Sequence, residues 1–457
     1  MPQPRTWFIA AALSAAGLAA ADEPLTQRAT WSGNLSHFMT GVPLAVDGPD
    51  VGTDVDQLVL PADIVVTAAD VPGTATLVSA TLYWGGTQTQ SGTGCVDSSP
   101  DIDVLLTFPD LSVNAVSADV CYCADGGLGL VDMYACNADI TADVGLGALV
   151  GTWRVDGYSG HIANGSTDNA SASLLLVYSD PAIGARRVVL YDGLQTLANS
   201  STNLNLTGFA AASPPSGSLT WFSMEGDVGA DPGEYVDVVG QPGLGSLRLT
   251  DGDNPNDDPM NRTINTTTPV QTGVTGVDID ELDITAALTD FDSQIDVTFS
   301  AGSDKWWLAV NVVGVDELPF IQGTKDWVLQ IDGDANGAPS LGDTIRYTVN
   351  LTNAGTLDGF GDVYDLVPAE ASGWALVNAG GGIDVSTATE VIVTDVFVAA
   401  GGNVDVIFDV VVGDYPDETP MNNTATVTDV NDGDATDASA PVVLIRKGTD
   451  GDNRYDN

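Results

Sequence analysis

Apolar and polar residues alternate along much of the chain, which is the pattern of β-strands with one buried face. In residues 345–352, Ile, Tyr, Val and Leu fall on one face, and Arg, Thr and Asn fall on the other. Residues 404–412 repeat this alternation, with valines and Phe408 on one face and aspartates on the other. Each segment therefore predicts one half-buried strand.

Two apolar runs without alternation, residues 174–178 and 306–310, predict central strands that are covered on both faces. Helical periodicity is almost absent. Glycine, of which there are 51, and Pro, Asn and Asp interrupt the apolar runs at short intervals, as turns do. The pattern predicts an all-β protein built of tandem β-sandwiches.

A strand-like run ends and a new pattern begins at residues 315–323, so we expect a domain boundary there. Residues 22–318 then form a large N-terminal β-sandwich region, either one elaborated sandwich or two packed together. Residues 319–447 form a smaller, compact sandwich, and residues 448–457 form an acidic tail.

The first 21 residues have the composition of a secretory signal peptide. Arg5 precedes an apolar run from Trp7 to Leu18, and three alanines follow. That run is shorter than the ~20 residues that a membrane-spanning helix needs. No later segment is both long enough and free of charges, so we expect a secreted chain, extracellular or at the cell surface, without a transmembrane segment.

The charge balance is extreme, with 13 Lys and Arg against 63 Asp and Glu, a net charge of −50. Such a field repels nucleic acid and anionic lipid and attracts cations, Ca²⁺ above all. A strongly acidic surface is also common in proteins from saline habitats, so the charge indicates either a cation-binding role or solvation.

Four cysteines lie within a stretch of about forty residues, namely Cys95, Cys121, Cys123 and Cys136. An even, clustered set in an exported chain predicts two disulfides. The pairing stays open, except that a bond between Cys121 and Cys123 is disfavoured by geometry. Zinc is the competing interpretation, but the cluster has neither a nearby histidine nor the paired spacing of a zinc site.

The segment from Asp332 to Asp343 resembles a twelve-residue calcium loop. Oxygen-bearing residues occupy its first, third, fifth and twelfth positions, and a glycine occupies the sixth. The predicted metal ligands are Asp332, Asp334, Asn336 and Asp343. The alternative is an Asx-rich loop that joins two domains. A second candidate metal loop contains Asp251, Asp253, Asp257 and Asp258, with a hydrated loop tip as the alternative.

Catalysis has little material in this sequence, because His37 and His161 are the only histidines. Ser159 lies close to His161 but lacks the Gly-x-Ser-x-Gly turn of a nucleophilic serine. We therefore expect no enzyme and no catalytic residues. Trp306 and Trp307 are consecutive and must point to opposite faces of their strand, so that one of them can be exposed. The pair is therefore the best aromatic candidate for a ligand-binding surface, with burial in the core as the alternative.

Three segments of the C-terminal region carry a resemblance, residues 341–355, 363–368 and 422–427. They resemble the "conserved repeat" domain of bacterial surface proteins, a domain of unknown function (number eleven). The resemblance implies an immunoglobulin-like sandwich that serves as a spacer or adhesive module. Residues 80–86, 174–181 and 189–193 are similar to the N-terminal portion of myxobacterial-type surface proteins with gliding-motility labels.

Together these features predict an exported, non-catalytic cell-surface or extracellular-matrix protein for adhesion or structural assembly. We expect calcium to stiffen the domain junction near residue 332, and we expect other surface proteins or extracellular glycans as partners. The alternative function is a carbohydrate-binding module or lectin-like protein, which requires an exposed, coplanar aromatic strip on one sheet face.

Overall fold

The computed structural model describes most of the chain between residues 23 and 446. The described residues are 23–48, 55–88, 100–124, 132–144, 148–162, 169–180, 182–224, 233–240, 245–355, 357–430 and 435–446. Within these ranges the regular structure is strand apart from α1 (Thr141–Val144) and the 3-10 helix η1 (Thr285–Ala287), so the predicted all-β class is confirmed. The expected signal peptide and acidic tail lie outside the described residues.

None of the helices in these ranges has the length and apolar character needed to cross a lipid bilayer. The chain divides into two compact units. The first comprises Met1–Phe209 and Pro214–Asp316, and the second comprises Ala210–Ser213 and Glu317–Asn457.

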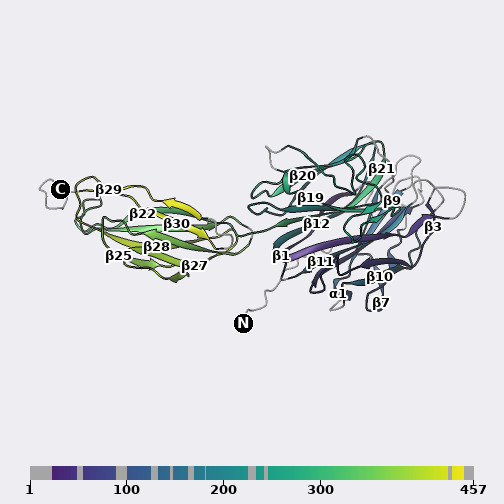
Figure 1. Ribbon diagram of the computed structural model, residues 1–457, viewed down its shortest axis with the longest axis horizontal. Coiled ribbons are helices and arrows are strands. Elements are labelled where there is room, and N and C mark those ends of the chain that lie inside the picture. The colour runs from purple at the N-terminus through teal and green to yellow at the C-terminus, as the bar shows by residue number, and fades with distance from the viewer. Residues whose placement is uncertain are drawn as a thin grey trace. The chain divides into compact units, whose positions relative to one another are not determined.

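An eleven-stranded sheet organises the first unit (Figure 1). Its strands, in spatial order, are β18 (Gln271–Thr272), β17 (Thr263–Ile264), β19 (Val277–Asp283), β14 (Gly217–Met224), β21 (Lys305–Asp316), β12 (Ala185–Ala198), β1 (Glu23–Pro43), β11 (Ala170–Ser179), β5 (Thr76–Gln88), β9 (Asp132–Asp139) and β8 (Val120–Ala124). The long strand β1 connects the two halves of this sheet, because its residues 23–34 pair with β12 and its residues 35–43 pair with β11.

Two four-stranded sheets cover the large sheet. One contains β4 (Ala62–Val66), β10 (Gly151–Asp156), β6 (Asp103–Thr107) and β7 (Val113–Ser117). The other contains β13 (Ser201–Thr207), β20 (Gln294–Ala301), β15 (Glu234–Val239) and β16 (Leu247–Arg248). A further hairpin pairs β2 (Ala45–Asp47) with β3 (Val55–Leu58).

Three separate apolar cores show that the first unit is a stack of four β-layers. The first core joins the β4 sheet to the half that contains β5 and β11, and the second joins the β20 sheet to the half that contains β14 and β21. The third contains Leu175 of β11 together with Phe222 of β14 and Val310 of β21, so the two halves of the large sheet face each other across it. Figure 1 shows β20, β12, β11 and β10 following one another through this stack.

Both apolar runs form strands that are covered on both faces, as predicted. In β11, Leu174 packs into the first core and Leu175 into the third. In β21, Trp306 packs into the second core and Trp307 into the third. The two tryptophans do point to opposite faces, but both are 0% exposed, so the predicted aromatic binding surface is wrong here. Burial of both faces of the central strand is the reason.

The second unit is a sandwich of two sheets around one core (Figure 1). The first sheet contains β22 (Ile321–Ile331), β23 (Thr344–Asn353), β28 (Asn403–Val412) and β25 (Ala371–Asn378). The second contains β26 (Ile383–Asp384), β27 (Glu390–Val398), β24 (Gly359–Leu366), β30 (Thr424–Asp429) and β31 (Ala435–Ser439). A short pair joins β29 (Thr419–Met421) to β32 (Val443–Ile445).

The two alternating segments of the sequence form neighbouring strands of this sandwich. β23 pairs with β28, and Tyr347 lies opposite Phe408, with the two rings stacked at 5.4 Å between centroids. Their apolar faces are buried in the core, and Arg346 on the other face forms an ion pair with Asp409. The predicted faces of both strands are confirmed.

Candidate functional site

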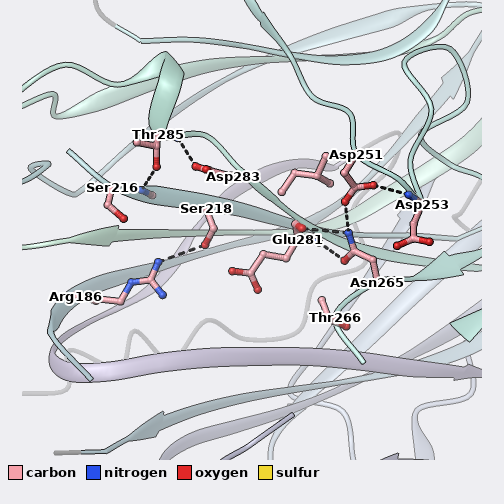
Figure 2. A pocket seen from close by; sticks show the side chains of 12 residues that line it. Arg186, Ser216, Ser218, Asp251, Asp253, Asn265, Thr266, Glu281, Asp283 and Thr285 are labelled. Carbon is pink, nitrogen blue, oxygen red and sulfur yellow. Dashed lines mark hydrogen bonds between the residues drawn. The ribbon is translucent and has the colours of Figure 1, made fainter. Parts of the chain in front are cut away.

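A pocket of about 510 Å³ opens in the first unit, where the ends of several strands of the large sheet meet the long loop between β16 and β17 (Figure 2). Its lining is polar and contains no aromatic side chain among the residues described. The lining residues are Arg186, Ser216, Gly217, Ser218, Asp251, Asp253, Asn265, Thr266, Glu281, Leu282, Asp283 and Thr285.

Asn265 fixes the loop to the strand that forms the pocket floor. Its side-chain amide donates to the backbone oxygen of Glu281 at 3.1 Å and accepts from the Glu281 backbone N–H at 2.8 Å. It also contacts Asp251 at 3.3 Å, as Figure 2 shows. Asp251 in turn accepts from the backbone N–H groups of Asp253 and Asn254 at 2.9 and 2.7 Å. These contacts hold several carboxylates at the pocket rim.

The charge of the pocket is strongly negative. Among the described lining residues only Arg186 is cationic, and it already forms an ion pair with Asp316 at 3.0 Å. His37 is buried, and its Nε2 lies 3.9 Å from the Glu281 carboxylate and 2.7 Å from the hydroxyl of Thr220. Burial lowers the pKa of His37, and nearby Glu281 only partly opposes this, so the imidazole is neutral near pH 7. The pocket suits a cation or a polar, hydrogen-bonding group.

The four aspartates of the second predicted metal loop do not converge. Asp251 and Asp253 line the pocket, while Asp258 is nearly buried. Among the described residues, the group of three acidic side chains close enough to share a metal is a different one. Asp251 instead caps its own loop. The structure therefore does not bring these four aspartates together as the ligand set that the sequence predicted.

Beneath this loop lie two buried carboxylates that the sequence analysis missed, Asp278 and Asp280 of β19. Both are 0% exposed. Asp278 accepts from the indole N–H of Trp221 at 3.1 Å, and Asp280 accepts from the hydroxyl of Thr263 at 3.2 Å. Burial raises the pKa of Asp278 to about 6 and raises that of Asp280 further, with the neighbouring carboxylate as the second cause. Alternating acidic residues in a strand usually indicate a solvent-exposed face, so the sequence pattern did not predict the burial of this pair.

In the second unit, the predicted calcium loop brings three of its four candidate ligands together. One carboxylate oxygen from each of Asp332, Asp334 and Asp343 lies within 4.8 Å of the others. The side chain of Asn336 donates to Asp334 at 2.7 Å and accepts from Ala338, so its oxygen is already used. The carboxylates also accept hydrogen bonds from the loop itself, including Gly337 N–H to Asp332 at 2.8 Å.

The position of this loop differs from the expectation. It connects β22 to β23, which are adjacent antiparallel strands of one sheet, and so it lies inside the second unit. The boundary between units is at Glu317, before the other end of β22. An ion in this loop would therefore stiffen one end of the sandwich and not the domain junction.

A cross-strand disulfide joins Cys121 of β8 to Cys136 of β9, which lie opposite each other at the edge of the large sheet. Cys123 is also disulfide-bonded, and Cys95 lies outside the described residues. The disulfide interpretation of the cluster is thus confirmed for Cys121 and Cys136, and zinc is excluded for that pair. As expected, Cys121 is not bonded to Cys123.

No family model matches the chain, and no curated protein matches it. Several solved structures show a distant similarity. An exo-β-N-acetylglucosaminidase from Vibrio harveyi is 13% identical over 28% of this chain, with a TM-score of 0.16. An exo-chitosanase from Amycolatopsis orientalis is 10% identical over 55% of this chain, with a TM-score of 0.19. The matches cover 18% and 25% of those two enzymes.

The N-terminal domain of an adhesin from Streptococcus gordonii is 8% identical. That match covers 94% of this chain and 95% of the adhesin domain, with a TM-score of 0.19.

Proposed function

We propose that this protein is an exported, non-catalytic component of a cell surface or extracellular matrix that acts in adhesion or structural assembly. The observation that carries the proposal is an apolar face exposed on the second unit. Soluble proteins seldom leave contiguous apolar side chains in water unless another molecule covers them.

This apolar face lies on the outer side of the sheet that contains β24, β26 and β27. Phe360 and Phe397 are paired across β24 and β27, are 42% and 44% exposed, and contact each other at 5.5 Å between ring centroids. Tyr364, Leu366 and Ile383 extend the face, and each is at least 40% exposed. Exposed aromatic residues on a rigid sheet are typical of the centre of a protein–protein interface.

The ring geometry favours a protein partner over a sugar. Phe360 and Phe397 meet at an interplanar angle of 63°, so their rings do not form the coplanar platform on which a sugar ring stacks. The buried pair Trp306 and Trp307 offers no such platform either. Carbohydrate binding therefore remains the less supported function, and another surface protein, or a second copy of this chain, is the proposed partner.

We also propose Ca²⁺ as the ion of the loop that contains Asp332, Asp334 and Asp343. Calcium takes carboxylate and carbonyl oxygens in flexible geometry, and three carboxylate oxygens already lie within 4.8 Å of one another. The net charge of −50 concentrates cations around the molecule and thereby favours occupancy.

The test of the adhesive face is the double variant Phe360→Ser/Phe397→Ser in the full chain. We expect at least a tenfold loss of self-association in sedimentation analysis, or of binding to immobilised envelope proteins, since central aromatic residues contribute about 2 kcal/mol or more. The matched control is Val328→Ser/Ile331→Ser, which removes two apolar side chains of the other sheet that are 55% and 56% exposed. Equal losses in both variants, or no loss in the first, would contradict this assignment.

A further inference from the structure

Three polar side chains meet in the core of the second unit, and none of them takes part in the proposed adhesive face or calcium loop. They are Lys325 on β22, Asp365 on β24 and Asn423, the residue directly before β30. Lys325 is 6%, Asp365 0% and Asn423 5% exposed. They come from three segments that are far apart in the sequence.

The strand register explains why they meet. Ile321 donates its backbone N–H to Asp429, and a Cβ on Gly323 would lie 2.3 Å from Val427, so β22 runs past β30 in opposite directions. This register places Lys325 level with Ala425. Asp365 pairs directly with Ala425 through β24, and Asn423 lies two residues before that position.

The contacts place an amine, a carboxyl group and a carboxamide together. Nζ of Lys325 contacts Oδ2 of Asp365, and both side chains are completely shielded from solvent. The Asn423 side chain interacts with the same carboxyl group, and its Nδ2 and Asp365 Oδ1 have no other hydrogen-bond partner. The rings of Tyr347 and Phe408 lie 4.7 and 5.3 Å from Nζ and exclude water.

This apolar setting favours the neutral forms of the amine and the acid. Burial raises the pKa of Asp365 to about 6 and lowers that of Lys325 to about 8, although their mutual attraction opposes both shifts. A buried ion pair contributes little net stability compared with apolar residues of the same volume. Near pH 7 the ion pair still predominates, but the two shifts bring the neutral pair within reach by transfer of one proton. In that form an uncharged lysine lies beside a protonated acid, which is a nucleophile with a proton carrier.

We propose that Lys325 and Asn423 become joined by an intramolecular isopeptide bond, with Asp365 as the proton carrier. Nζ of neutral Lys325 attacks Cγ of Asn423 while protonated Asp365 donates its proton to the carboxamide oxygen. Asp365 then moves one Nζ proton to Nδ2, and the Cγ–Nδ2 bond breaks. Ammonia leaves, the hydroxyl proton of the intermediate returns to Asp365, and the carbonyl re-forms. Amine and carboxamide give a secondary amide and ammonia, so no oxidant, reductant or other reactant is needed.

The bond would tie the first strand of the second unit to one of its last strands. The proposed bond is independent of what the second unit binds, so the proposal does not rest on the adhesive face. A covalent tie between β22 and β30 would prevent the sandwich from opening under tension, which is a useful property in a chain that links surfaces.

The test is mass spectrometry of the purified, reduced full chain after proteolysis. We expect one branched peptide that contains both Lys325 and Asn423, lighter by about 17 Da than the sum of its two parts, because one ammonia is lost. The unbranched peptides should be absent from fully reacted protein. Separate, unlinked peptides in the wild-type digest would overturn the proposal without the need for any variant. A bond from Lys325 to Asp365, with loss of water, would also overturn it.

Variants assign the roles of the three residues. Lys325→Met and Asp365→Asn should each abolish the branched peptide, whereas Lys305→Arg, which alters the other lysine that lies over an aromatic ring, should leave it intact. Asn423→Asp keeps an acyl group, so any remaining bond must then form with loss of about 18 Da, the mass of water. A branched peptide that persists in Asp365→Asn would contradict the assigned proton carrier. Circular dichroism shows which variants are folded.

Discussion

At the scale of single residues, the buried carboxylates fall into two kinds according to what compensates them. Asp192 accepts from Arg28 at 2.9 Å and from the hydroxyls of Tyr83 and Tyr122 at 3.1 and 2.9 Å. Asp278 and Asp280, in contrast, are surrounded by neutral donors in the described structure. A compensated charge stabilises its surroundings, whereas two adjacent uncompensated ones repel each other in a medium of low dielectric constant.

The Asp278–Asp280 pair predicts an unusual dependence of stability on pH. Its folded-state pKa values are raised above the unfolded value of 3.8, to about 6 for Asp278, so the folded chain binds more protons than the unfolded chain between these pH values. Stability must therefore fall as pH rises through this window. We expect Asp280→Asn, which keeps the shape but cannot ionise, to stabilise the first unit at pH 7 by about 2 kcal/mol, because an amide need not take up a proton when the chain folds.

Denaturant unfolding at pH 5 and pH 7, in the presence of a chelator, measures this effect. The variant should show a smaller difference between the two pH values than the wild type. Asp296→Asn is the matched control, because Asp296 is partly exposed and hydrogen-bonded to Asn205 at 2.9 Å. If Asp280→Asn lost stability at pH 7, the pair would be charged and compensated, and the interpretation would be wrong.

At the scale of strands and loops, the segment from Asp332 to Asp343 makes the sharpest prediction. If it binds Ca²⁺, saturation at about 100 times the dissociation constant stabilises the second unit by about 2.7 kcal/mol. Adding a chelator should then lower its melting temperature by roughly 5 °C or more. The melting temperature of the double variant Asp332→Asn/Asp334→Asn should not respond to chelator. The control is Asp405→Asn, which should respond like the wild type, because Asp405 lies in the same unit but is hydrogen-bonded to Asn350.

Calorimetric titration distinguishes the two outcomes for this loop. Saturable heats that disappear in the double variant would support the calcium site. Equal, non-saturating heats in the wild type and the double variant would show that the carboxylates are satisfied by the loop itself, as the hydrogen bond from Gly337 to Asp332 already indicates.

Sequence periodicity predicted individual strands but not which strands pair with one another. The alternation in residues 345–352 and 404–412 defines the buried faces of β23 and β28, because burial of one face is a local property of a strand. The same rule fails for Asp278, whose strand is covered on both sides. In the sequence, Lys325 has no feature that distinguishes it from other polar residues. Its contacts with Asp365 and Asn423 form only in the folded unit, across about a hundred residues of chain.

The passage of β1 from one half of the large sheet to the other also escaped prediction. No sequence feature identifies the point, between residues 34 and 35, where pairing with β12 ends and pairing with β11 begins, because long-range contacts determine both partners. The calcium loop shows the opposite case. The spacing of Asp332, Asp334 and Asp343 is local, and it correctly predicted which carboxylates would lie together, but not that the loop would lie inside one unit.

At the scale of the whole molecule, the net charge of −50 dominates the electrostatics, because 13 basic residues can neutralise only a small part of 63 acidic ones. Self-repulsion of this size destabilises the compact state, and dissolved salt screens it over about 10 Å at 0.1 M. We expect the melting temperature of the full chain to rise by several degrees between low salt and ~1 M NaCl. Loss of the few exposed ion pairs, such as Arg154 with Asp63, opposes this only weakly.

Screening and calcium binding can be told apart because they differ in ion specificity. NaCl and KCl at equal ionic strength should raise the melting temperature equally, and they should do so in Asp332→Asn/Asp334→Asn as well as in the wild type. Millimolar CaCl₂ in a background of high salt should act on the wild type alone, since screening is then complete and only a specific site remains to respond. A melting temperature that fell with added NaCl would mean that attractive ion pairs outweigh the repulsion between like charges. That result would contradict the view that the net negative charge destabilises the folded chain.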